Sequence, residues 1–491
     1  MFRIISKELL EALVSYRLAA AVVLCLLMIP LSLYIHAQDY RQRWSFYEAS
    51  RANYQERARG HVGPELQAEG YRPPSPWLWV ASGLEPVLPT KVVVSREGGV
   101  QVRHEGEVSN PLALVFGPAD LAFIVGAVLS LLAMVFTFDS IAGEKERGTL
   151  GLLMAQPVAR WQVLLGKVLG AYVLLLVPTV LGGIVGLIAL ILTGSAAVLQ
   201  GPYGAAALGL VFGMTLLFLL AMVALGVFVS ARTVRSTTAL VTLLLLWTLM
   251  VLVVPKVSPM VAAVVYPVES PQVHDLRKQL VRQNITQEWE RARRELFDRT
   301  LLGFGLDPKE RGWDVMYAKE GGLLQVRQAY EDARQNLDRV FEGRLQAELD
   351  RLEQDYVNRR NVQVRIARRL ARLSPVSCYA LVLTEVAGTG VTAVDTLRAN
   401  ARRFLTEVWD QVYSKWILHW YGSAAGGYMS IRTEIVKGFD PKQAPVPHLR
   451  YQWAAWPEVW QAIWVDVLLL GFYAVAFLAG AYVSFLRYDV R

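Results

Sequence analysis

The residues best placed to do chemistry are four consecutive charges between two long apolar runs: Glu144, Lys145, Glu146 and Arg147. They lie in the stretch FDSIAGEKERGTLGLLMAQPVARWQVLLGKV, residues 138–168. Neighbouring carboxylates and cations can form charge-assisted hydrogen bonds to a partner of complementary charge. They can also simply stop a membrane span, because charge is costly in lipid. The residue types alone leave both interpretations open.

A second candidate is Asp466, inside the last apolar run, 461–486. A carboxylate there is costly unless it is paired or wetted, so Asp466 is either a helix-end group near the interface or part of a translocation path. Tryptophans recur at helical spacing around the start of the same run. Because Trp favours the headgroup region, we predict that they share one helical face as an outer-leaflet anchor, with ligand stacking as the alternative: Trp453, Trp456, Trp460 and Trp464.

Patterns for catalysis are missing from the sequence. It has no HExxH, no CxxC and no GxSxG in a strand-to-helix setting. The six His are scattered, and Cys25 and Cys378 fall on different sides of the predicted membrane boundary and cannot pair. We predict no catalytic, cofactor-binding or metal-binding residues. Since the phosphate-binding loop is also missing, any ATP chemistry requires another chain, and the net charge of +8 does not call for nucleic acid.

The elements that position these residues are membrane spans. Of the 491 residues 54% are hydrophobic and only 19% are charged, which is too apolar for a soluble chain of this size. A bilayer core of about 30 Å needs about 20 apolar residues per helix. Six segments qualify: 18–36, 119–138, 168–193, 205–230, 239–265 and 461–486.

Lys and Arg in the short flanks predict the orientation. They gather in residues 1–17, in the 139–167 loop, in the 231–238 loop and after the last span, whereas the 194–204 loop has none. Cytoplasmic loops carry the excess of Lys and Arg. We therefore predict that both termini and the 139–167 loop are cytoplasmic, in an inner membrane.

Two large segments then lie outside, 37–117 and 266–458. Residues 37–58 read as a charged helix that continues the first span outward, and the alternation around Gly98 and Gly99 predicts a β-hairpin. In the second segment apolar residues step by three or four between Leu337 and Tyr356, which predicts a long helix with a sister helix at 272–299. This pair is interpreted as a solvated helical hairpin or as a coiled coil that docks a partner.

The inner loop can now be interpreted. Thr149 is a candidate N-cap, a short helix LGLLMAQ follows and is ended by Pro157, and Arg160 returns the chain to the membrane. A short helix at the inner surface offers a rigid contact for a cytoplasmic partner.

This loop resembles the signature E-x-E-x-G-T-L-x-x-L-L-x-x-P-x-x-R-x-x-x-L-x-G-K of type-2 ABC exporter permeases. The residues in register are Glu144, Glu146, Gly148, Thr149, Leu150, Pro157, Arg160, Gly166 and Lys167. In that family the segment is the coupling helix that meets the ATPase subunit. The branch that groups nitrous-oxide-reductase maturation and gliding-motility permeases is the most similar, since RLSPVSCYALVLTEVAGTG (372–390) resembles its Leu-Ser-Pro and Ala-Gly-Thr pattern. The chain departs from the maturation permeases in the size of its outer segments.

The resemblance implies an exporter or extruder with ATP and magnesium on separate ATPase chains, a second permease copy or homologue, and a bilayer of a bacterial or archaeal inner membrane. It assigns ATPase coupling to residues 144–150, Pro157 and Arg160. The rival hypotheses are a membrane-anchored assembly factor whose outer domain holds an extracytoplasmic partner, and an intramembrane hydrolase. No binding motif in the sequence identifies the substrate.

The predicted fold is an all-α polytopic membrane protein of six transmembrane helices with a mostly helical extracytoplasmic domain and a small β-hairpin. Its parts are an amphipathic elbow helix at 1–17, span one at 18–36, an outer segment at 37–117, span two at 119–138, a coupling segment at 139–167, spans three to five within 168–265, an outer helical domain at 266–458 and span six at 461–486.

Overall fold

The structure, a computed structural model, describes residues 16–96, 99–103, 119–154, 159–193, 199, 201, 203–318, 321–421 and 430–487. Pro157 therefore lies outside the described residues, and so does the predicted elbow helix at 1–17 except for its last two residues. Most of the described chain is helical. It divides into two compact units: one contains 1–258, 369–413 and 440–491, and the other contains 259–368 and 414–439. The predicted outer segment 266–458 is thus shared between the two units.

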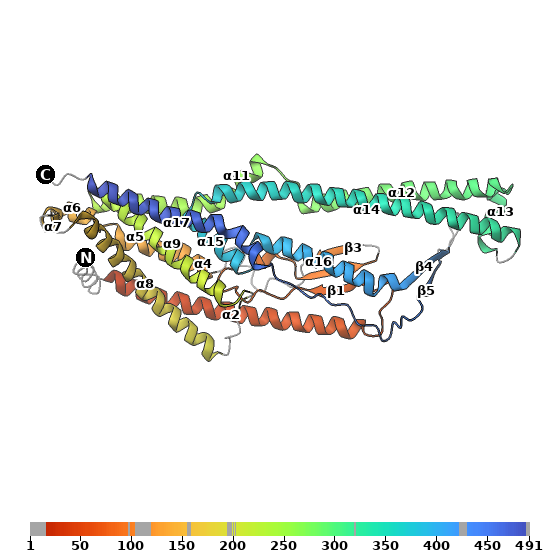
Figure 1. The fold of residues 1–491 in the computed structure, drawn as a ribbon, viewed down its shortest axis with the longest axis horizontal. Coiled ribbons are helices and arrows are strands. Elements are labelled where there is room, and N and C mark those ends of the chain that lie inside the picture. The colour runs from red at the N-terminus through yellow and green to blue at the C-terminus, as the bar shows by residue number, and fades with distance from the viewer. Residues whose placement is uncertain are drawn as a thin grey trace. The chain divides into compact units, whose positions relative to one another are not determined.

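The first unit contains the membrane bundle (Figure 1). Its long helices carry almost only apolar side chains over more than 18 residues. In lipid the backbone N–H and C=O groups of such a segment must bond to one another, which a helix allows. They are α2 (Tyr16–Ala58), the stretch α4 (Leu121–Phe123), η2 (Ile124–Leu129), α5 (Ser130–Thr137) and α6 (Ala142–Glu146), then α8 (Arg160–Leu192), α9 (Gly204–Arg232), the stretch α10 (Ser236–Trp247), η4 (Thr248–Val253) and α11 (Val254–Val265), and α17 (Trp456–Leu486). Residues 259–265 of α11 belong to the second unit. Helix α7 (Leu150–Met154) links α6 to α8. The prediction of a mostly helical polytopic membrane protein is confirmed.

Within the described residues, seven stretches are long and apolar enough to cross a membrane, one more than predicted. The additional stretch, Pro375–Lys415, is not one helix. It consists of α15 (Pro375–Val386), α16 (Val391–Gln411) and η5 (Tyr413–Lys415). Between α15 and α16 the chain turns at Gly388, whose φ is +70°, and the buried Glu385 carboxylate accepts the backbone N–H groups of Val391 and Thr392 at the start of α16. Because 12 residues of α15 are only about 18 Å long, α15 does not cross the bilayer alone.

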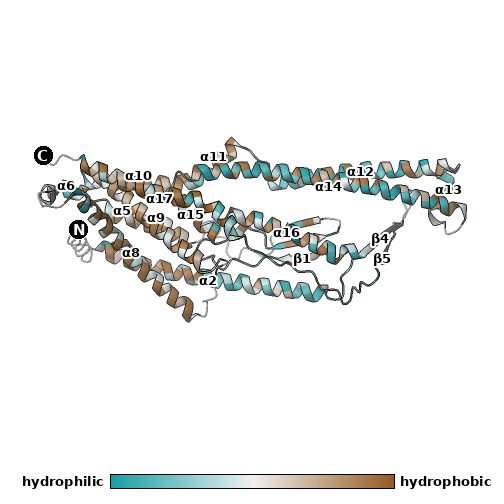
Figure 2. Cartoon of the chain, viewed as in Figure 1, coloured by the Kyte–Doolittle hydropathy of each residue, from teal (hydrophilic) through white to brown (hydrophobic). Residues whose placement is uncertain are grey.

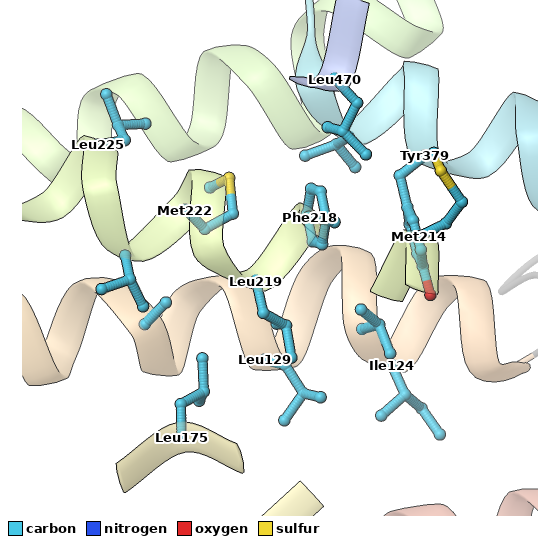
Figure 3. Packing of buried hydrophobic residues seen from close by; sticks show 14 of the residues in the cluster. Ile124, Leu129, Leu175, Met214, Phe218, Leu219, Met222, Leu225, Tyr379 and Leu470 are labelled. Carbon is cyan, nitrogen blue, oxygen red and sulfur yellow. The ribbon is translucent and has the colours of Figure 1, made fainter. Parts of the chain in front are cut away.

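Helix α9 forms the centre of the bundle core. Figure 3 shows Met214, Phe218, Leu219, Met222 and Leu225 of α9 among side chains of the neighbouring helices. The Phe218 ring stacks on Tyr379 of α15, with centroids 4.7 Å apart. Buried apolar area of this kind is what holds helices together once they are inserted, mainly through close packing.

Hydropathy changes along α2 (Figure 2). The first half is apolar and the second half, beyond about residue 37, is charged, as the sequence predicts for a span that continues outward. In the second half Tyr54 and Ala58 are buried against Tyr71, with Val446 beside them, so the outer helix packs on strand β1. Trp44 and Phe46 stay exposed.

The predicted hairpin is present and belongs to a larger sheet. Strands β2 (Lys91–Ser95) and β3 (Gly99–Arg103) pair antiparallel, and β1 (Ala68–Tyr71) adds to the other edge of β2, which the sequence did not predict. Gly99 has a φ of +64°, a conformation that the tight connection requires and glycine accepts. A short 3-10 turn, η1 (Glu85–Val87), precedes β2.

The second unit is a long helical hairpin. Helix α12 (Pro271–Gly303) begins with Ser270, whose Oγ accepts from Val273 N–H, and ends in the turn at Gly305, where φ is +73°. Helix α13 (Pro308–Tyr317) and helix α14 (Gly322–Ala371) follow, and strands β4 (Trp416–Tyr421) and β5 (Ser430–Ile435) pair antiparallel. The two helices predicted at 272–299 and around 337–356 are present, with the break where Gly303, Gly305 and Pro308 indicated it.

The tryptophan prediction is wrong in one respect. Helix α17 begins at Trp456, so Trp453 precedes the helix and packs under Gly388 instead. Trp456 lies against Tyr203, with ring centroids 5.5 Å apart. Trp460 and Trp464 are exposed on α17, as expected of anchors at a membrane interface.

Candidate functional site

Residues 138–150, called the inner turn because the sequence predicts them on the cytoplasmic side, are built around the five-residue helix α6. Such a short helix has no stability of its own and needs partners for its terminal N–H groups. Ser230 of α9 supplies them: its Oγ accepts from the backbone N–H groups of Ile141 and Ala142, both at 3.0 Å, and donates to the Phe138 carbonyl at 2.9 Å. Because Ser230 is fully buried, α6 is attached to the end of α9 rather than lying free on the surface.

Glu144 points into the bundle. Its Oε1 accepts from Lys167 Nζ of α8 at 2.8 Å, and both side chains are buried. The other carboxylate oxygen, Oε2, is buried without a hydrogen-bond partner among the residues that the structure describes. Breaking a buried pair by removing one partner leaves an uncompensated charge, which is strongly destabilising. The pair therefore fixes α6 against the start of span three.

Lys145 binds the C-terminal end of α9. Its Nζ donates to the carbonyl of Ala231 and, at 3.1 Å, to that of Thr233. The last carbonyls of a helix lack intrahelical partners and carry partial negative charge, so a cation is favourable there. Together with Ser230, Lys145 holds both the beginning and the middle of α6 on α9.

Glu146 binds the N-terminal end of α10. Its Oε2 accepts from the backbone N–H of Ser236 at 2.9 Å and from the Ser236 hydroxyl at 2.7 Å. The residue in the N-cap position, Arg235, makes no side-chain cap of its own. A carboxylate at a helix N-terminus is favoured by the free N–H groups and by the helix dipole. Glu146 thus caps span five from another segment of the chain.

Residues 147–149 form the exposed tip of the inner turn. Gly148 has a φ of +71°, its N–H donates to Lys145 O at 3.2 Å, and Thr149 N–H donates to Glu144 O at 3.0 Å. These two bonds are the pair that ends a helix on a left-handed glycine. The Thr149 hydroxyl also donates to Glu144 O, and Arg147 Nε donates to Gly143 O at 3.0 Å. Three exposed residues therefore project on a rigid, hydrogen-bonded turn.

The remaining predicted coupling residues lie around this turn. Leu150 is buried in the bundle core, and Arg160, at the start of α8, donates to the Leu486 carbonyl at the end of α17 at 2.9 Å. Arg17 of α2 forms a 2.9 Å ion pair with Asp139 and stacks over the Phe138 ring. All six spans thus end at, or bind to, the inner turn or the segment that follows it.

Asp466 lies apart from the inner turn. It is fully buried in α17 and makes a bidentate ion pair with Arg372, with distances of 2.7 Å from Nε to Oδ1 and 3.1 Å from Nη2 to Oδ2. The Arg372 carbonyl accepts a hydrogen bond from Oη of Tyr473, which lies on α17 like Asp466, at 2.9 Å. The carboxylate is therefore paired, as an acidic group inside a span has to be. Both residues belong to the first unit.

The sequence did not reveal Ser230 or Ser236 as members of the site. A serine at the end of an apolar run usually bonds its own helix four residues back, and nothing in the sequence distinguishes these two from such residues. The sequence placed Lys167 in register with the family signature but did not identify the residue that it binds. The Gly-Lys that closes the signature was the one usable signal, because a lysine so close to a span needs an acidic partner.

Comparisons with known proteins agree on one family. The family described as ABC-2 family transporter protein matches residues 2–490 of the chain. The chain is 32% identical over 188 residues to the "Probable ABC transporter permease protein NosY" of Pseudomonas aeruginosa, covering 38% of this chain and 64% of that protein. It is 34% identical over 106 residues to the protein of the same name from Stutzerimonas stutzeri, covering 22% and 36%. The chain thus spans less than two thirds of the length of each of these curated relatives.

Proposed function

Because the chain belongs to the ABC-2 family of transporter proteins, we propose that it moves a substrate across the membrane with energy from a separate ATPase subunit. It is a multi-pass membrane permease of that family. Two permease copies would work with two ATPase chains, which would bind ATP and magnesium. The membrane is a bacterial or archaeal inner membrane, with both chain termini and the inner turn on the cytoplasmic side. The relatives named as permeases support this assignment.

One observation carries the mechanism: three successive side chains of α6 bind three different helices. Glu144 binds α8, Lys145 binds the end of α9 and Glu146 binds the start of α10. A short rigid element attached in this way transmits a displacement to several spans at once, since packed helices move as bodies rather than bend continuously. We therefore assign the charged group to transmission within the permease.

The contact with the ATPase then falls on the exposed tip, Arg147, Gly148 and Thr149. Glu144 and Lys145 are engaged with the chain's own helices and offer little to a partner. Arg147 supplies the one cation of the tip, which would pair with an acidic groove on the ATPase. A rigid tip loses little conformational freedom on binding, which favours association.

The test separates contact from transmission. The full-length permease is co-expressed with a candidate ATPase subunit from the same genome and purified through the permease. Arg147→Glu should abolish co-purification, because it reverses the charge at the contact. Glu146→Gln should keep co-purification and lose stimulation of ATP hydrolysis, because it weakens only the attachment to α10. Arg359→Glu, on the exposed face of α14, is the control and should change neither result.

Two outcomes would overturn the proposal. If wild-type permease retains no ATPase, the alternative of a membrane-anchored assembly factor gains support. If Arg147→Glu and Glu146→Gln both leave binding and stimulation unchanged, the inner turn is only a stop-transfer flank. Single cysteines at Arg59 and Asp440 should react with a membrane-impermeant reagent from outside, and one at Arg147 only from inside.

A further inference from the structure

Spans two and five each contain one π-helical turn. In span two, η2 ends with the N–H of Ser130 donating to Val125 O, five residues back. In span five, η4 ends with the N–H of Val254 donating to Leu249 O in the same pattern. A π-turn inserts a residue into an α-helix, interrupts its regular bonding and is a common place for a kink, often at a functional site.

Both of these spans are also connected to α6. Span two continues into α6 through residues 138–141, and the start of span five is held by Glu146 at Ser236. A displacement of the inner turn therefore acts directly on the inner end of both spans. In span five η4 lies near the middle, whereas in span two η2 lies near the outer end, after the three residues of α4.

The two π-turns are joined through one hydroxyl group. Trp247, immediately before η4, donates its indole N–H to Ser130 Oγ at 2.9 Å, and Ser130 immediately follows η2. Ser130 is fully buried and donates to the Gly126 carbonyl within η2 at 2.6 Å. In lipid a serine hydroxyl that satisfies freed carbonyls lets a helix deviate from α-geometry without leaving a polar group unpaired.

The first turn of α15 contacts both π-turns. Ser374 Oγ donates to the Met250 carbonyl within η4 at 2.6 Å. Val376 lies against Gly126 of η2, where an added Cβ would come within 3.3 Å of its Cγ1. At its other end α15 leads through Glu385 to α16, which packs on β2 and β3 of the outer part of the same unit.

We propose that the paired π-turns are the hinge of this permease, and that Ser130 and Trp247 are positioning residues that make spans two and five bend together. Helix α15 carries the movement to the outer part of the first unit. The proposal rests on the proposed function, because it requires that the ATPase displaces the inner turn. It adds the residues at which each of the two spans would bend.

The experiment uses the full permease–ATPase complex in lipid nanodiscs with spin labels. One label sits at Phe212, an exposed residue of α9, and the second sits at Leu245, before η4, or at Val257, after it. Distances are measured without nucleotide and with ATP trapped by a hydrolysis-deficient ATPase. The variants are Ser130→Ala and Trp247→Phe, with Ser130→Thr as the conservative rescue. Thr242→Ala is the matched control, because Thr242 bonds only within its own helix, to Thr238 O.

In the wild type both label pairs should respond to ATP. In Ser130→Ala and Trp247→Phe the Leu245 pair should still respond to ATP. The fraction of molecules in which the Val257 pair responds should fall roughly fivefold, because each variant removes one hydrogen bond between the spans. Ser130→Thr and Thr242→Ala should behave as wild type. A normal Val257 response in both variants, or an equal loss in Thr242→Ala, would overturn the hinge. If the wild type retains the ATPase but neither pair responds to ATP, the proposed function itself fails, and the hinge with it.

Discussion

The inner turn around α6 and the hairpin of α12 and α14 use the same charged residue types differently. In the inner turn Glu144 binds a residue 23 positions away and Glu146 one 90 positions away. Along α14 many pairs are local, within four residues: Arg327 with Glu331, Arg334 with Asp338 and Arg359 with Asp355. Bonds between distant segments fix helices to one another, whereas local surface pairs mainly keep a single helix soluble and add little stability.

The hairpin has one cluster that resembles the inner turn. His274 of α12 is buried, with Nδ1 at 3.1 Å from Glu269 Oε1 and Nε2 at 3.1 Å from Glu353 Oε2 of α14. Its ring stacks on Tyr356, with centroids 4.2 Å apart, and Lys278 contacts Glu353 at 3.3 Å. Long-range polar attachment between α12 and α14 therefore occurs at this cluster and again where Arg344 pairs with Glu288 and Trp289 donates to Asp338, both at 2.8 Å. The three ion pairs named above within α14 itself are local.

The largest effect is expected from Lys167→Met. It leaves the Glu144 carboxylate buried without its cation and should cost about 3 kcal/mol, lowering the apparent melting temperature of the detergent-solubilised permease. The double variant Glu144→Gln with Lys167→Met should recover most of this loss, because no charge is then left unpaired. A double variant as unstable as Lys167→Met would mean that packing, not charge, holds α6 on α8.

His274→Ala should have the next largest effect, at about 2 kcal/mol, because it removes both contacts to carboxylates. The loss should be local to the second unit and faster hydrogen exchange should be confined to α12 and the facing part of α14. Exchange rates in α9 serve as the internal reference. Unchanged exchange in α12 would show that the cluster contributes nothing beyond the local pairs.

Glu146→Ala should have a smaller effect, because it removes a cap from the first turn of α10. Faster hydrogen exchange should appear in the first turn of α10 and not in α8. Glu146→Asp, which keeps the charge on a shorter side chain, is the matched comparison. An effect on α8 as large as on α10 would contradict the assignment of Glu146 to span five alone.

Arg359→Ala should have the smallest effect, at most about 0.5 kcal/mol, since the pair with Asp355 is exposed and local. Adding 0.5 M salt should remove the difference between variant and wild type, because exposed pairs are screened. A loss of stability as large as that of Lys167→Met would contradict the conclusion that local pairs on α14 contribute less than the bonds of the inner turn.

Much of the fold followed from local patterns. Apolar runs of about 20 residues predicted the six spans, the alternation around Gly98–Gly99 predicted β2 and β3, and Gly303, Gly305 and Pro308 predicted the end of α12. Such features depend on neighbours within a few residues, so the sequence contains them directly. The strand β1 and the division of Pro375–Lys415 into α15 and α16 were missed, because they depend on pairing and capping by distant segments.

The sequence by itself determined that charges follow span two and that the segment has the family signature. Only the tertiary structure decided which helix each charge holds. The partners Lys167, Ser230 and Ser236 belong to other spans. The sequence does not indicate which group each of their hydroxyl or ammonium groups binds. The same holds for Asp466 and Arg372, 94 residues apart, and for the link between Trp247 and Ser130, 117 residues apart. A polar group in lipid must find a partner, but the packing of the helices decides which one lies within reach.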